Sequence, residues 1–250
     1  MPMFKRADAE IRYEVHGSGF PVLLYAPGGL KSQMEMWCEI SPAYPNGVPW
    51  MDPRKALSDR FTVIAMDQRN AGRSVADVKP DHGWHTFAAD HFALMDHLGF
   101  DKFHVMGGCI GGSYCFEAIE QHPDRIAAAV LQNPIGLWEN RDIWDSAVAG
   151  YGETVRGRDP SISEAIIRSF GKNMFGGDFV FSVSRDFVRN CKTPLYLQPG
   201  SDKPHPGKTS EEIAALAPNL EVQKEWKGPT YLDESIRRVR AFLERNTPRI

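Results

Sequence analysis

The sequence HVMGGCIGGS, residues 104–113, decides the fold of this chain. An apolar run that contains Phe103 and Val105 leads into Gly-Gly-Cys-Ile-Gly, and apolar residues at helical spacing follow over residues 114–119. β-branched and aromatic residues favour a strand, whereas apolar residues three and four positions apart favour a helix. The stretch therefore predicts a strand, a tight turn and a helix in that order.

Cys109 stands at the centre of a Gly-x-nucleophile-x-Gly pentapeptide, residues 107–111. Between a strand and a helix, this pentapeptide forms a nucleophile elbow, in which the glycines let strand and helix approach closely around a residue with a strained backbone. A helix that begins near Gly111 would favour a thiolate and lower the thiol pKa from its ordinary value of about 8.5. We therefore expect Cys109 to be a nucleophile, with the Ile110 N–H aimed at the substrate oxygen. A small buried cysteine without chemistry is the alternative.

Two further loops occur in an order that is typical of one superfamily. An apolar run over residues 22–26 ends in Pro-Gly-Gly, and a second run over 61–66 ends in DQRNAGRS, residues 67–74. The second loop is similar to the Asp-x-Arg-Gly-x-Gly-x-Ser loop of the α/β-hydrolase superfamily, with Asn70 in place of the first glycine. Asparagine tolerates the left-handed backbone better than other side chains, so this replacement is mild. With the elbow, these loops make the chain resemble the small, capped, esterase-like members of that superfamily from end to end.

The resemblance implies an α/β-hydrolase fold, with a mostly parallel sheet flanked by helices, and strands that alternate with helices agree with it. We expect one domain over residues 1–250, with a core of 1–136 and 191–250 and a helical cap inserted over 137–190. A cap rich in large apolar residues would close a pocket and exclude water. Near the end of the core, we expect a helix over 210–216 with Ser210 as its N-cap.

The same resemblance implies an oxyanion hole made of two backbone N–H groups. Ile110 supplies one, and the loop after the strand at 22–26 supplies the other. Ala26 and Pro27 occupy the place where the superfamily often has His-Gly, whereas Gly28 and Gly29 remain. Either glycine is a candidate for the second donor.

The general base is where the superfamily pattern breaks. Asp202 occupies the position of the usual acid, but no histidine follows His205, and the stretch EWKGPTY at 225–231 lacks the usual one. In one interpretation, His205 reaches Cys109 and serves as the base. In another, the thiolate needs no base, and Asp202 or His205 protonates the leaving group or activates water. In a third, catalysis is lost and the pocket binds a ligand. The histidines around Trp84 remain open as further candidates for the base, namely His82, His85 and His91.

Composition limits the partners. The net charge is −3 with dispersed basic residues, which does not suggest nucleic acid. No apolar run is long enough for a membrane span, and the N-terminus lacks the apolar core of a signal peptide. None of the four cysteines falls in a CxxC pair, and no histidine spacing matches a metal site. We expect a cytoplasmic protein without cofactor or metal; a homodimer is compatible with the sequence, which does not specify the oligomeric state.

These observations favour a cofactor-independent hydrolase of a small ester, lactone, thioester or related carbonyl compound. Cys109 would attack, Gly28 or Gly29 and Ile110 would stabilise the oxyanion, and Asp202 and His205 would complete the site. A lyase or an acyltransferase that uses the same site is one alternative, and a ligand-binding protein without catalysis is another.

Overall fold

A computed structural model describes residues 2–38 and 47–249 of the chain. Within these residues, nine strands form one sheet in the order β1-β2-β4-β3-β6-β7-β8-β9, and β5 pairs with β2. The neighbouring pairs from β4 to β9 are parallel, whereas β1, β2 and β5 pair antiparallel at one end. The predicted mostly parallel sheet is confirmed. The strands are β1 (Met3–Lys5), β2 (Ala9–His16), β3 (Phe20–Tyr25), β4 (Phe61–Met66), β5 (Val75–Ala76), β6 (Phe103–Gly108), β7 (Ile126–Gln132), β8 (Leu195–Gln198) and β9 (Leu220–Val222).

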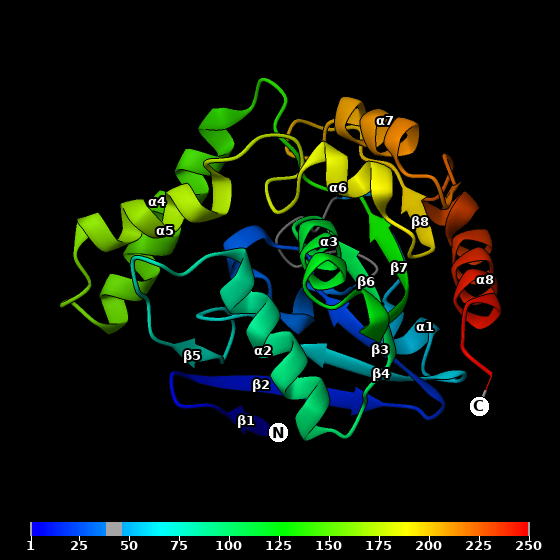
Figure 1. Cartoon of the computed structure of the whole chain (residues 1–250), viewed down its shortest axis with the longest axis horizontal. Helices are drawn as coiled ribbons and strands as arrows, with labels where there is room; N and C mark the ends of the chain where they lie inside the picture. The colour runs from blue at the N-terminus through cyan, green and yellow to red at the C-terminus, as the bar shows by residue number, and fades with distance from the viewer. Residues whose placement is uncertain (1, 39–46, 250) are drawn as a thin grey trace.

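Helices cover both faces of the sheet, as Figure 1 shows. Successive side chains of a strand point to opposite faces. Leu23 accordingly packs in the core that α2 (Trp84–His97) and α3 (Gly111–Gln121) help to form, whereas its neighbour Val22 packs in a second core with residues of α8 (Pro229–Arg245). The central strands are therefore buried on both sides, which explains their nearly continuous apolar sequences.

The segment predicted as a cap contains α4 (Arg141–Arg158), α5 (Glu164–Phe175) and α6 (Arg185–Asn190), all between β7 and β8. In Figure 1, α4 and α5 lie side by side and extend beyond the sheet, while α6 contacts α7 (Gly207–Leu216). Aromatic rings hold α4 to α5 and to the following loop: Trp144 stacks on Phe175 at 5.1 Å, and Tyr151 stacks on Phe170 at 4.7 Å. Helix α4 also contacts the 3-10 turn η1 (Gly29–Lys31), next to the expected oxyanion loop.

The expected start of one helix is wrong. Helix α7 (Gly207–Leu216) begins after Pro206, three residues before Ser210. The Ser210 hydroxyl does not cap the helix; it accepts a hydrogen bond from the Gly200 N–H at 3.1 Å. A side chain that the sequence assigned to a helix end therefore holds the loop that carries Asp202 and His205. The remaining short elements are α1 (Pro53–Ala56), η2 (Met34–Met36) and η3 (Pro123–Arg125).

Candidate active site

Cys109 lies between the end of β6 and the start of α3, so the predicted strand, turn and helix are confirmed. Its φ angle is 58°, a left-handed conformation that strains a residue with a side chain. The flanking glycines permit the close approach that this turn needs. A Cβ on Gly107 would lie 2.0 Å from the Gly111 carbonyl oxygen, and a Cβ on Gly111 would lie 2.2 Å from that of Tyr25. The elbow thus presents a half-buried thiol at the N-terminus of α3.

The backbone around the thiol favours a negative charge. Burial would raise the pKa of Cys109, but the charge and hydrogen bonding of His205 and the N–H groups of Gly28 and Ile110 outweigh it and lower the pKa below the ordinary value. Gly28 has a φ of 118° at the start of η1. Of the two candidate glycines, the one whose N–H acts on the sulfur is therefore Gly28. Two N–H groups that meet at the nucleophile are the arrangement an oxyanion hole requires.

Asp202 and His205 lie on one tight turn between β8 and α7. The His205 Nδ1 is 2.5 Å from Asp202 Oδ1, and the His205 N–H donates to the same oxygen at 3.1 Å. Backbone hydrogen bonds between these two residues, at 3.1 and 3.3 Å, close the turn. The imidazole orientation is therefore fixed by its own loop.

The second ring nitrogen of His205 is directed to the thiol. Nε2 is buried and has no hydrogen bond of regular geometry to any described residue, while the Cys109 sulfur is the polar group that acts on it. Burial opposes a charge on His205, but the Cys109 thiolate and Asp202 outweigh it and raise the His205 pKa to about 9. The same contact lowers the Cys109 pKa. The structure thus brings Cys109, His205 and Asp202 together, with the N–H groups of Gly28 and Ile110 acting on the sulfur.

Comparison with known proteins shows to which family the chain belongs. Residues 21–232, which are most of the chain, match the family model described as alpha/beta hydrolase fold. The chain belongs to the α/β-hydrolase family.

Relatives of this α/β-hydrolase carry the names of several hydrolases. The protein named "Putative carbamate hydrolase RutD" from Caulobacter vibrioides is 32% identical over 126 residues, which cover 49% of this chain and 42% of that protein. Fluoroacetate dehalogenase from Burkholderia sp is 29% identical over 170 residues, covering 61% of this chain and 51% of that protein. The matches thus span about half the length of these relatives.

The likeness in structure extends over the whole chain. The enol-lactonase from Burkholderia xenovorans LB400 matches with a TM-score of 0.68 at 18% identity, covering 97% of this chain and 100% of that one. At such low identity, the likeness establishes the fold alone. The hydrolase names belong to the relatives, and their substrates differ from one relative to the next.

A lysine occupies the segment where α/β-hydrolases usually place the base. Lys227 follows β9 and donates from Nζ to Asn133 Oδ1 at 2.6 Å, with the ammonium 4.9 Å from the Trp226 ring. Burial lowers the Lys227 pKa, while the charge of Asp202 acts in the opposite direction. Lys227 in turn helps to lower the Asp202 pKa. The sequence analysis missed this residue, although its position in the stretch that lacks the histidine was the available signal.

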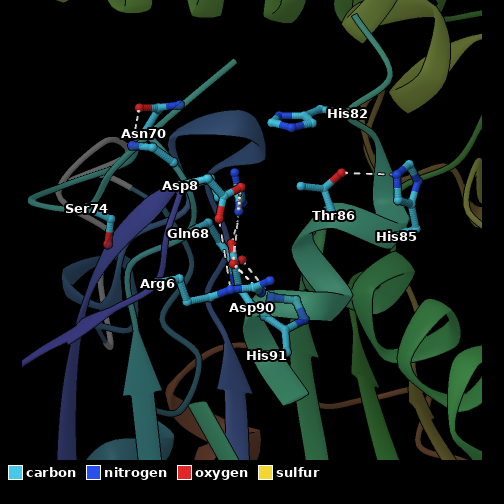
Figure 2. A network of polar contacts seen from close by, with 12 residues as sticks. Arg6, Asp8, Gln68, Asn70, Ser74, His82, His85, Thr86, Asp90 and His91 are labelled. Atoms are coloured by element: carbon cyan, nitrogen blue, oxygen red, sulfur yellow. Dashed lines mark hydrogen bonds and ion pairs between the residues drawn. The ribbon is translucent and has the colours of Figure 1, made fainter. Parts of the chain in front are cut away.

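The other candidate bases belong to a different polar network, shown in Figure 2. His91 on α2 is fully buried against Gln68, with its Nε2 2.7 Å from Oε1, and burial, reinforced by Arg69, lowers its pKa to about 3. His82 lies beside the Lys79 N–H, and His85 lies 3.3 Å from the Thr86 hydroxyl. No described contact joins these three histidines to Cys109, in contrast to His205.

The centre of that network is Arg69 in the loop DQRNAGRS, residues 67–74. Its guanidinium pairs with Asp90 of α2 and with Asp8, while Arg6 also pairs with Asp90. Asn70 has a φ of 58°, the left-handed conformation for which asparagine is suited. The loop therefore ties the sheet to α2 and fixes the backbone beside the cap.

Neither a metal cluster nor a membrane helix is found in the part of the chain that the structure describes. Over residues 2–38 and 47–249, no group of three His, Cys, Asp or Glu side chains could hold a metal ion. No helix in the same ranges is long and apolar enough to cross a bilayer.

Proposed function

We propose that this α/β-hydrolase is a cofactor-independent hydrolase of a small ester, lactone, thioester or related carbonyl compound. The observation that supports it most is the line from Asp202 through His205 to the Cys109 sulfur. Relatives named as hydrolases of small molecules point to the same class. In this proposal Cys109 is the nucleophile, His205 the acid and base, Asp202 its orienting carboxylate, and Gly28 and Ile110 the oxyanion donors.

The reaction follows from the charges in the site. The lowered Cys109 pKa and the raised His205 pKa favour a thiolate beside an imidazolium at neutral pH. The thiolate attacks the substrate carbonyl carbon, and the oxygen becomes an oxyanion between the two N–H groups. As the carbon–oxygen bond to the leaving group breaks, the imidazolium gives its proton to the departing oxygen. A thioester at Cys109 and a neutral His205 remain.

Deacylation uses the same groups in reverse. Neutral His205 takes a proton from water, and the hydroxide attacks the thioester carbonyl carbon. Collapse of the second tetrahedral intermediate breaks the carbon–sulfur bond and releases the carboxylic acid. The thiolate and imidazolium are thereby restored. The second step depends on His205 more than the first, because water needs a base whereas a thiolate does not.

Intact-protein mass after brief exposure to p-nitrophenyl acetate tests the proposal, with p-nitrophenol release followed in parallel. Wild type should form an acetyl adduct and turn over. Cys109→Ala should lose adduct and turnover with an unchanged circular dichroism spectrum, and His205→Ala should acylate but release product at least about a hundredfold more slowly. Substantial turnover by Cys109→Ala would falsify the proposal.

Acyl transfer is a second candidate, favoured by the contact of cap helix α4 with the turn that follows Gly28. A covered site excludes water and lets another nucleophile accept the acyl group. Product analysis with and without an added alcohol or amine decides between the two, since acid as the sole product rules out transfer. The ligand-binding alternative was motivated by the missing histidine, and the position of His205 beside Cys109 removes that motive.

A further inference from the structure

Tyr114 carries a buried hydroxyl that the catalytic scheme does not use. This residue lies in the first turns of α3, five positions after Cys109, and is completely buried. Its Oη has no hydrogen-bond partner among the described residues. A phenylalanine would fill the same space without the free-energy cost of an unpaired buried hydroxyl, so the presence of a tyrosine calls for a role of that hydroxyl.

The Tyr114 ring is held by aromatic contacts, while electrostatic interactions show which groups lie near its hydroxyl. Four rings lie at centroid distances of 5.2 to 5.9 Å, namely Tyr25, Trp84, Phe87 and His91. Burial, then Tyr151 and then Cys109 raise the Tyr114 pKa well above its ordinary value. The hydroxyl therefore lies close enough to the nucleophile and to cap residue Tyr151 for both to act on it.

Tyr151 offers a second hydroxyl whose proton is free. This residue belongs to α4 and is held by stacking on Phe170. Its oxygen accepts a hydrogen bond from Asn70 Nδ2 at 3.1 Å, while Asn70 Oδ1 is occupied by the Ala76 N–H at 3.0 Å. Because Asn70 is the donor, the Tyr151 O–H must donate elsewhere, and no described residue accepts it. Two hydroxyl protons thus lack an acceptor beside the cap.

The sheet order shows which part of a substrate would meet these hydroxyls. His205 follows β8, whereas Asn70 follows β4, and these strands lie on opposite sides of β6, which carries Cys109. In the proposed mechanism His205 protonates the leaving group, so the leaving group lies on the β8 side. The acyl group then extends toward the β4 side, where Asn70 supports Tyr151 and where Tyr114 lies.

We propose that Tyr114 and Tyr151 form an acyl-group subsite that hydrogen-bonds an uncharged oxygen of the substrate. The preferred substrates are then short acyl compounds with a hydroxyl or keto oxygen beyond the reacting carbonyl, rather than plain alkyl esters. The groups whose hydrogen bonds meet there are phenols and an amide, which suit a neutral oxygen. The guanidinium groups of Arg69 and Arg158 also act on the Tyr151 hydroxyl, but Arg69 is paired with two carboxylates and Arg158 donates to the Ser74 carbonyl oxygen at 3.4 Å. A substrate carboxylate would have to compete with these contacts, which makes its burial there costly. The inference rests on the proposed function and specifies its substrate class.

A matched pair of substrates tests this subsite. p-Nitrophenyl 3-hydroxybutyrate and p-nitrophenyl 3-methylbutyrate differ only by a hydroxyl in place of a methyl group. We expect wild type to prefer the hydroxy ester about tenfold in kcat/KM after correction for the hydroxide-catalysed rates, as one net hydrogen bond would give. In the double variant Tyr114→Phe/Tyr151→Phe the ratio should fall to about one, and in Tyr114→Phe it should lie between one and the wild-type ratio. Tyr25→Phe is the matched control, because it removes another buried unpartnered hydroxyl that no interaction joins to Cys109, and it should keep the wild-type ratio.

The outcomes separate this inference from the proposed function. A wild type that turns over both esters through a Cys109 adduct without preferring the hydroxy ester overturns the subsite alone. A wild-type preference that survives undiminished in Tyr114→Phe or in the double variant does the same. A wild type that forms no adduct with either ester overturns both proposals together. Because Tyr114→Phe removes only an unpaired atom, we expect it to fold, and its thermal unfolding midpoint checks this.

Discussion

At the scale of single residues, the site depends on how Cys109 and His205 share a proton. A free thiol is mostly protonated at neutral pH, whereas the thiolate is the nucleophile. The Ile110 N–H of the elbow and the Gly28 N–H of the neighbouring loop favour the thiolate, but burial of the sulfur acts against them. The charge of His205 provides the additional stabilisation. In the proposed mechanism, His205 therefore stabilises the thiolate in addition to moving protons. A serine hydroxyl in the same place would not be ionised and would gain nothing from that charge.

Alkylation by iodoacetamide measures this coupling without a substrate. In wild type the apparent pKa of Cys109 should lie below about 8.5, so that the rate remains high at pH 7. In His205→Ala the imidazolium is lost while burial remains, and the pKa should rise, slowing the reaction at pH 7 at least about tenfold. Peptide mass analysis follows Cys109, and Cys109→Ala gives the background from Cys38. Identical pH profiles for wild type and His205→Ala would show that the two residues are not coupled.

Sequence reasoning reached some of these residues and not others for a definite reason. Cys109 and Ile110 are held by a local turn that is encoded within a few residues, whereas the oxyanion loop offered Gly28 and Gly29 as alternatives. His205 could be named only as a candidate, because its approach to Cys109 depends on how two strand ends meet. Lys227 and Tyr114 were missed because their importance comes from contacts with residues distant in the sequence, such as Asn133 and Tyr151.

At the scale of elements, the contact between β6 and α3 determines whether the nucleophile is presented. The glycines at 107 and 111 place the backbones so close that no side chain fits between them. The rest of α3 then packs on β6 and β7 and beside α2, and its Tyr114 and Phe116 are fully buried. The helix that stabilises the thiolate is thus also part of the main core.

Gly107→Ala tests how tightly the elbow is packed. Its Cβ would lie 2.0 Å from the Gly111 oxygen, so the backbones must separate, and we expect the free energy of unfolding to fall by about 1–3 kcal/mol or more. Gly150→Ala on α4 is the control: nothing lies within 4 Å of its Cβ, and alanine favours a helix by about 1 kcal/mol. Urea denaturation measures both variants. Equal stability of Gly107→Ala and wild type would contradict the packing described.

Element boundaries show where the sequence was a reliable guide. Strand β4 falls where the apolar run over 61–66 places it, because a buried strand needs a short continuous run of β-branched and aromatic residues. The start of α7 does not fall where the sequence predicts it, since Ser210 is a favourable N-cap when only the local sequence is considered. In the folded chain its hydroxyl is bound by Gly200 of a loop brought there by β8. This tertiary contact outweighs the local preference of Ser210 for a helix N-cap.

At the scale of the whole molecule, buried histidines make stability depend on pH. His104 on β6 lies between the sheet and α8 and contacts Phe20 at 4.8 Å. Burial, partly offset by the Leu243 backbone, lowers its pKa to about 3, and His91 has a similar value for a similar reason. Below about pH 6.5, both histidines remain neutral in the folded state, whereas they bind protons in the unfolded chain. The unfolded state then takes up more protons, so stability falls as the pH falls from 6.5 toward 3.

His104→Gln isolates this effect. Each such histidine lowers the free energy of unfolding by about 1.4 kcal/mol for each pH unit below 6.5. Over the two units from pH 6.5 to 4.5, the free energy of unfolding of His104→Gln should therefore fall by about 2–3 kcal/mol less than that of wild type. Urea denaturation at several pH values gives the difference. The exposed His85→Gln is the control and should follow the wild-type curve. Parallel curves for wild type and His104→Gln would mean that His104 is charged in the folded state.

The turn that carries Asp202 and His205 has a consequence for how such an enzyme can change. In most α/β-hydrolases the acid and the base sit on separate connections, so altering one connection disturbs their distance from each other. Here the turn of residues 202–205 fixes the distance between Asp202 and His205 by itself, so the two side chains move as one unit. Insertion, shortening or exchange of the loop would move both groups together relative to the thiol. In the proposed mechanism, the segment after the last strand does not have to supply the base.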